Sequence, residues 1–178
     1  MIEIRFWPVF ILITIVWVVI RLIIAAKNRH IDWLRELKLL TVYICIVVIT
    51  RIVYFPWHLE NGHVGPLIFD PKRILPFWLN LVPFVHLFDS YDDRMLNLFG
   101  NIAMFIPVGM AWPFCFKQLD SIKKVVLAGF GFSLLIELSQ LLFCYRGTDI
   151  DDLITNTTGV LIGACIYFLI TRTRNKTV

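Results

Sequence analysis

The chain has 178 residues, of which 58% are hydrophobic and 17% charged, and its formal net charge is +4. Soluble domains are typically about 45–50% apolar and about 25% charged, so this composition excludes an ordinary soluble domain. The cations fall in short stretches between apolar runs, which is a pattern of membrane topology and argues against a nucleic-acid partner. The length fits one domain, and we expect a single membrane domain over residues 1–178.

Five apolar runs are long enough to cross a bilayer, since a spanning helix needs about 20 mostly apolar residues. We therefore predict an all-α, polytopic integral membrane protein with about five transmembrane helices. The predicted spans are approximately residues 6–26, 37–57, 95–116, 125–145 and 153–171. Four cysteines lie in or beside these runs without a CxxC pair, and we interpret them as helix-packing residues.

Residues 58–94 form a long loop between the second and third spans in this prediction. Within it, residues 74–88 are uncharged and aromatic, but the stretch is short and contains Pro76 and Pro83. Segments of that length are more often re-entrant or interfacial than spanning. We keep five spans and expect the loop to return to the membrane surface, with a sixth span as the alternative.

The distribution of Lys and Arg sets the predicted orientation. One side of a five-span protein carries twice as many as the other. The richer side has Lys27, Arg29, Arg35, Lys38, Lys117, Lys123, Lys124, Arg172, Arg174 and Lys176, and the poorer side has Arg5, Lys72, Arg73, Arg94 and Arg146. The positive-inside rule places the richer side in the cytoplasm, with the N-terminus outside and the C-terminus inside.

Polar side chains interrupt the apolar runs between residues 96 and 170. Counting 1.5 Å per residue from the outer end of each span places Arg51, Asn101, Glu137 and Asn156 roughly 5–10 Å below the outer boundary. Unpartnered polar groups are costly in hydrocarbon. We therefore predict one outward-facing binding site. Its predicted residues are Asn97, Asn101, Glu137, Gln140, Arg146, Asp149, Asp152 and Asn156.

Spacing within the predicted helices agrees with a shared site. Asn97 and Asn101 are four residues apart, and Glu137 and Gln140 are three apart, so each pair lies on one helical face. Asp152, Asn156, Gly159 and Gly163 form one stripe whose glycines permit close helix contact. In addition, Asp92-Asp93-x3-Asn97-x2-Gly100 repeats the spacing of Asp151-Asp152-x3-Asn156-x2-Gly159, which predicts two parallel helices with equivalent polar faces.

Other interpretations remain open. Asp149 is suited to cap a helix that begins near Ile150, and Asn97 and Asn101 are suited to hold helices together by hydrogen bonds. Glu137 is an ionisable group at membrane depth, which by default indicates function, and Arg51 or Arg146 is its natural ion-pair partner. The scatter of His58, His63 and His86 does not indicate a metal site, so we predict no metal and no cofactor.

The same motifs resemble the VanZ-like family of small bacterial membrane proteins, named for a teicoplanin-resistance protein. The resemblance covers residues 96–170. It comprises Asn97-x2-Gly100-Asn101, Phe105-x-Pro107-x-Gly109, Glu137-x2-Gln140 and Arg146-x2-Asp149-x-Asp151-Asp152-x3-Asn156-x2-Gly159-x3-Gly163. It implies a multi-pass protein of the bacterial plasma membrane that in some members lowers susceptibility to teicoplanin-type glycopeptide antibiotics.

Three functions compete at this point. The first is modulation of the cell envelope, with the polar site binding membrane lipid, an outer-leaflet headgroup or a peptidoglycan precursor. The second is an integral-membrane enzyme that processes a lipid-linked precursor, with Glu137 as candidate acid/base. Known lipid-phosphatase and metalloprotease motifs are missing from the sequence. The third is transport, which the internal repeat favours and five spans disfavour.

Overall fold

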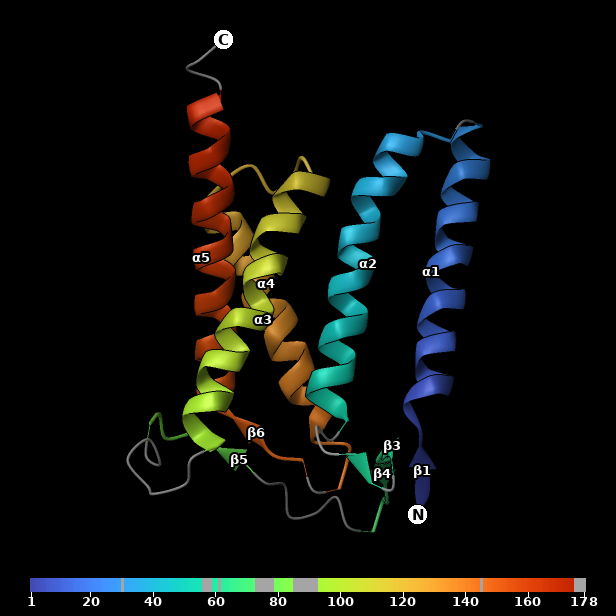
Figure 1. Ribbon diagram of the computed structural model, residues 1–178, viewed down its shortest axis with the longest axis vertical. Coiled ribbons are helices and arrows are strands. Elements are labelled where there is room, and N and C mark those ends of the chain that lie inside the picture. The colour runs from blue at the N-terminus through green and yellow to red at the C-terminus, as the bar shows by residue number, and fades with distance from the viewer. Residues whose placement is uncertain are drawn as a thin grey trace. The chain divides into compact units, whose positions relative to one another are not determined.

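The computed structural model describes residues 1–178 except 30, 56–58, 61, 73–78, 85–92, 145 and 175–178. It contains five helices, which confirms the predicted all-helical class (Figure 1). They are α1 (Phe6–Asn28), α2 (Trp33–Tyr54), α3 (Asp93–Cys115), α4 (Ile122–Gln140) and α5 (Ile150–Arg174). Contacts divide the chain into two units: Met1–Leu75 with Phe143–Tyr145, and Pro76–Leu142 with Arg146–Val178.

Four of the helices, α1, α2, α3 and α5, are long and apolar enough to cross a membrane. The remaining helix, α4, has 19 residues and carries Lys123, Lys124 and Glu137. It starts three residues before the predicted fourth span and ends at Gln140 rather than at 145. The segment after it forms a turn instead, in which the Leu142 N–H donates to the Ser139 carbonyl.

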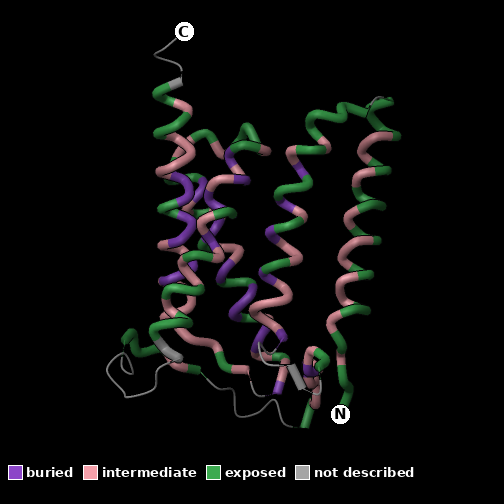
Figure 2. The backbone as a smooth tube through the Cα atoms, viewed as in Figure 1, coloured by how far each residue is buried: buried purple, intermediate pink, exposed green. Residues whose placement is uncertain are grey.

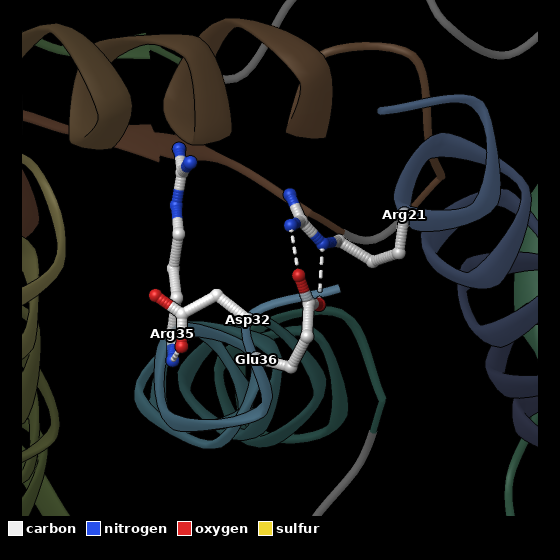
Figure 3. Close-up of polar contacts among 4 residues, drawn as sticks. All are labelled: Arg21, Asp32, Arg35 and Glu36. Carbon is white, nitrogen blue, oxygen red and sulfur yellow. Dashed lines mark hydrogen bonds and ion pairs between the residues drawn. The ribbon is translucent and has the colours of Figure 1, made fainter. Parts of the chain in front are cut away.

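The first unit is built on α1 and α2, which run antiparallel and pack together. No residue of α1 is buried, so its apolar surface suits contact with lipid. A hydrogen bond between the Thr14 and Tyr43 hydroxyls and a tilted contact between the rings of Trp17 and Tyr43 join the two helices. An ion pair of Arg21 with Glu36, made through two guanidinium nitrogens, joins them as well (Figure 3). In Figure 2, α1 carries only exposed and intermediate residues along its length.

The ends of α1 and α2 follow from local hydrogen bonding. At the start of α2, the Asp32 side chain accepts a hydrogen bond from the Arg35 N–H at 3.2 Å, as an N-cap residue does (Figure 3). At the end of α1, Arg29 takes a left-handed conformation with φ 53° and its N–H donates to the Ala26 carbonyl. These hydrogen bonds define where α1 ends and where α2 begins.

Short strands complete the first unit. The N-terminal strand β1 (Ile2–Ile4) pairs antiparallel with β4 (Leu67–Phe69), and β2 (Leu59–Glu60) pairs antiparallel with β3 (His63–Val64). The Ile68 carbonyl accepts a hydrogen bond from the Cys144 N–H at 2.8 Å, so β4 is held on both edges. The loop predicted over 58–94 therefore contains local sheet structure in its described residues.

The second unit is a bundle of α3, α4 and α5 with a pair of two-residue strands at one end (Figure 1). These strands, β5 (Leu79–Asn80) and β6 (Thr148–Asp149), pair in parallel. Most of the 74–88 segment, whose relation to the membrane the sequence left open, lies outside the described residues. Figure 2 shows that the buried parts of this unit concentrate where its helices face one another.

Glycines bring α3 and α5 into backbone contact. A Cβ atom added at Gly159 would overlap the Ile102 carbonyl oxygen, and one added at Gly163 would overlap the Ile106 carbonyl oxygen. Both contacts advance in the same direction along the two helices, so α3 and α5 are parallel. The stripe of small residues on α5 therefore does what the sequence predicted, since it lets two helices approach closely.

Candidate functional site

The polar residues of the second unit gather where α3 and α5 begin and α4 ends. Their placement follows from the register of α4 against α5. Ser133 contacts Asn156, and a side chain at Gly129 would meet Val160. In antiparallel helices each step along one helix is matched by a step back along the other. Glu137 on α4 therefore lies level with Asp152 on α5, one turn from the Ser133–Asn156 contact.

Glu137 is the most buried carboxylate of the site, with 2% of its surface exposed. Its Oε2 accepts a hydrogen bond from the Asp149 N–H at 3.3 Å, and its backbone carbonyl accepts one from the Thr148 hydroxyl at 2.7 Å. The carboxylates of Asp149 and Asp152 are close enough to act on it electrostatically. A group that is both buried and beside like charges is rare in structures unless it serves a purpose.

Asp152 joins α5 to α3. Its Oδ1 accepts a hydrogen bond from the Asn101 side-chain amide at 2.6 Å. This places Asn101, Asp152 and Glu137 in one region, as the predicted site requires. The remaining asparagine of α3, Asn97, is exposed, and so is Gly100.

The described residues of the two segments with the repeated spacing, Asp92–Gly100 and Asp151–Gly159, therefore lie in different environments. Asn156 is 2% exposed and Gly159 is in backbone contact, whereas Asn97 and Gly100 lie on an exposed face. The prediction of parallel helices is confirmed by the α3–α5 contacts. The prediction of equivalent polar faces is wrong, because α5 is central to the bundle and α3 packs through a different face.

Asp149 has two roles at the start of α5. Its Oδ1 accepts a hydrogen bond from the Asp151 N–H at 2.9 Å, which confirms the predicted helix cap. Its two carboxylate oxygens also accept from the Asn80 amide at 3.2 and 3.1 Å. The neighbouring Asp151 accepts from the Phe84 N–H at 2.9 Å. The helix cap thus also fixes the chain between 79 and 84.

Asn156 and Ser133 form the deeper level of the site. The Asn156 Nδ2 group donates to the Ser133 hydroxyl at 3.0 Å, and both residues are buried. The Asn156 Oδ1 atom is buried and accepts no hydrogen bond from the part of the chain that the structure describes. Such an atom is costly in a protein interior and indicates a site where a donor can enter.

The other predicted site residues belong to the same unit. Gln140 is buried at the end of α4, and Arg146 is half-buried in the turn between α4 and α5. Burial lowers the pKa of the Arg146 guanidinium from its ordinary value. Arg51, the candidate partner of Glu137, belongs to the first unit. There its guanidinium lies 5.8 Å from the centre of the Phe6 ring, and its pairing with Glu137 stays a prediction.

The site also contains residues that were not predicted from the sequence: Ser133, Asn80, Thr148 and Asp151. Ser133 carried a usable signal, since it lies four residues before Glu137 on the same helical face. Asn80 carried none, because it reaches Asp149 through the pairing of two strands 69 residues apart. The described residues contain no group of three or more His, Cys, Asp or Glu side chains placed to hold a metal ion, and His58 and His86 lie outside them.

Comparison with known proteins decides the family. The sequence profile of the VanZ/LLP1 family matches residues 39–171, about three quarters of the chain. The chain belongs to the VanZ/LLP1 family. The match contains α3, α4 and most of α5, the three helices that carry the family motifs and the candidate site, and it confirms the resemblance seen in the sequence. Together with the apolar helices, it makes the protein a VanZ-like membrane protein.

One relative in this family is Protein VanZ of Enterococcus faecium. It is 32% identical over 98 residues, which cover 55% of this chain and 57% of that protein. The alignment thus spans little more than half the length of the relative. No solved structure matches the chain.

Proposed function

We propose that this VanZ-like protein acts at the outer face of the bacterial plasma membrane, where it modulates the cell envelope and lowers susceptibility to teicoplanin-type glycopeptides. The observation that carries the proposal is the polar site of the second unit. Four segments of the chain contribute to it, and it holds a buried Glu137 beside Asp149 and Asp152. Such an arrangement is expensive to maintain between apolar helices unless something binds there.

Charge supports the outward orientation of this site. Within the second unit, Lys117, Lys123, Lys124 and Arg172 lie at or near the end of the bundle opposite Glu137. The end of a membrane bundle that is richer in Lys and Arg faces the cytoplasm as a rule. Glycopeptides of the teicoplanin type act outside the membrane, so an outward-facing site is in the compartment where the drug and its targets meet.

The proposal is tested by expressing the protein in a teicoplanin-susceptible bacterium and measuring the minimum inhibitory concentration. We expect the wild-type protein to raise it and Glu137→Gln to abolish the increase at equal membrane abundance. Asp120→Asn is the matched control, since Asp120 is an exposed carboxylate in the loop before α4. An inhibitory concentration that the wild-type protein leaves unchanged would contradict the resistance part of the proposal.

The same strains separate modulation by binding from catalysis. If Glu137 is an acid/base catalyst, mass analysis of envelope lipids and precursors will show a substrate lost and a product gained with the wild-type protein. Glu137→Gln will reverse both changes. If the protein acts by binding alone, the lipid and precursor profile will be the same with and without it.

A further inference from the structure

Around Glu137 and Asp152, the described residues supply more hydrogen-bond acceptors than donors. Asp149 accepts from the Asn80 amide and from the Asp151 N–H, Asp152 accepts from the Asn101 amide, and Glu137 accepts from the Asp149 N–H. The charged groups that act on Glu137 and Asp152 among the described residues are carboxylates. Among the described residues, the charge around Glu137 and Asp152 is therefore negative, and their carboxylate oxygens have acceptor capacity left over.

The deeper level of the site has the same deficit. Asn156 lies one helical turn below Asp152 on the same face of α5, and its side chain reaches α4 at Ser133, one turn below Glu137. Its buried Oδ1 atom accepts no hydrogen bond from the described chain. This carbonyl is neutral and belongs to a different residue from the carboxylates, so it is an independent sign that a donor is missing between α4 and α5.

A cation that donates hydrogen bonds would satisfy both the carboxylates and the Asn156 carbonyl. A bare metal ion fits poorly, because the carboxylates of the described residues are not grouped as metal ligands. A primary ammonium carries one positive charge and three N–H donors. It can contact two carboxylates and an amide carbonyl at ordinary hydrogen-bond distances, without the short ligand shell that a divalent cation requires.

We propose that the site between α3, α4 and α5 binds a primary ammonium group of an envelope component, with Glu137 and Asp152 as its counter-ions and Asn156 as the deeper acceptor. Two sources present this group at the outer surface: an aminated lipid headgroup, and a free amine on a peptide such as a cell-wall precursor. This proposal adds the chemistry of the ligand to the proposed function. It rests on that function only for the location of the site at the outer face of the membrane.

The first arm of the test uses lipid as the probe. The full-length protein is placed in nanodiscs of phosphatidylglycerol containing either phosphatidylethanolamine or phosphatidylcholine, and retained lipid is measured by native mass spectrometry. We expect phosphatidylethanolamine to be retained over phosphatidylcholine, whose quaternary ammonium has no N–H. Asp152→Asn and Glu137→Gln should each weaken retention about tenfold or more, as expected when a charge-assisted hydrogen bond is removed.

The second arm uses a soluble amine. Binding of a short lysine-containing peptide is measured by calorimetry and compared with the same peptide acetylated on its side-chain nitrogen. Binding of the free amine alone, without selective retention of phosphatidylethanolamine, would assign the ligand to a peptide. Selective retention of phosphatidylethanolamine alone would assign it to a lipid.

Two further variants keep the test decisive if a substitution impairs folding. Asp152→Glu preserves the charge and should retain binding more strongly than Asp152→Asn, whereas Asp120→Asn should bind like the wild-type protein. Preference for phosphatidylglycerol, or binding that is indifferent to the amine, would overturn the inference. Variants that lose the antibiotic phenotype while amine binding is unchanged would overturn it and leave the proposed function standing.

Discussion

The side-chain amide of Asn101 lies 2.6 Å from the Asp152 carboxylate, and this hydrogen bond ties α3 to α5 at the level of Glu137. We expect Asn101→Leu to lower the free energy of unfolding by about 1–3 kcal/mol, because it leaves a partly buried carboxylate without its donor. Unfolding of the detergent-solubilised protein by titration with a denaturing detergent measures the loss. Asn97→Leu is the control, since Asn97 is exposed one turn earlier on the same helix. Equal losses in the two variants would refute a specific role for Asn101.

Replacing glycine with alanine should lower the stability of the protein at one position and raise it at two others. Gly159→Ala should destabilise the protein by about 2 kcal/mol or more, because its Cβ would overlap the Ile102 carbonyl oxygen and force α3 and α5 apart. Gly131→Ala in α4 and Gly100→Ala in α3 should instead stabilise the protein by about 0.5–1 kcal/mol, since a Cβ at either position meets nothing within 4 Å. The same unfolding titration resolves both signs, and destabilisation by all three would count against the close contact.

The Arg21–Glu36 ion pair should be coupled energetically. Its side chains are 17% and 27% exposed, and the guanidinium binds the carboxylate through two nitrogens (Figure 3). A double-mutant cycle with Arg21→Gln and Glu36→Gln should give a coupling energy of about 1 kcal/mol. The Lys124–Asp120 pair, whose side chains are 54% and 60% exposed, should show no measurable coupling. A coupling at Lys124–Asp120 as large as that at Arg21–Glu36 would contradict the burial argument.

Topology can be tested on two exposed loop positions of the second unit. In a variant whose native cysteines are replaced by serine, Gly147→Cys should be labelled by a membrane-impermeant thiol reagent added to intact cells. Gln118→Cys at the opposite end of the bundle should be labelled only after the membrane is broken. Labelling of position 118 from outside intact cells would reverse the orientation that we infer from the basic residues.

The helices were predictable from the sequence because apolar length alone indicates a membrane span. The predicted ends were less accurate. The fourth span was extended to 145 because Leu141–Cys144 are apolar, but Thr148 and Asp149 bond back to Glu137, and the chain turns after Gln140. Apolar composition alone cannot predict hydrogen bonds between a helix and the loop that follows it.

The sequence could predict the candidate site where spacing within one helix, or the rise per residue along it, determines which residues lie at the same level. Counting residues placed Asn101 and Glu137 at one level of the bundle, as the structure does, and the structure puts Asn156 one helical turn further in. Rotation of each helix about its axis was beyond such counting, and this is why Asn97 was assigned to the site although it lies on an exposed face. Asn80 was missed because its place depends on a strand pairing between distant segments.

The central position of α5 has a consequence for synthesis of the protein. Both α3 and α4 pack more extensively on α5 than on each other, and α5 follows them in the chain. When α3 and α4 have entered the membrane, Glu137 has not yet met the Asp149 N–H, and Asn156 has not yet met Ser133. Until α5 is synthesised, the Glu137 side chain of the nascent protein therefore lacks the hydrogen bond from the Asp149 N–H. Insertion of α4 should accordingly depend on how quickly α5 arrives at the translocon.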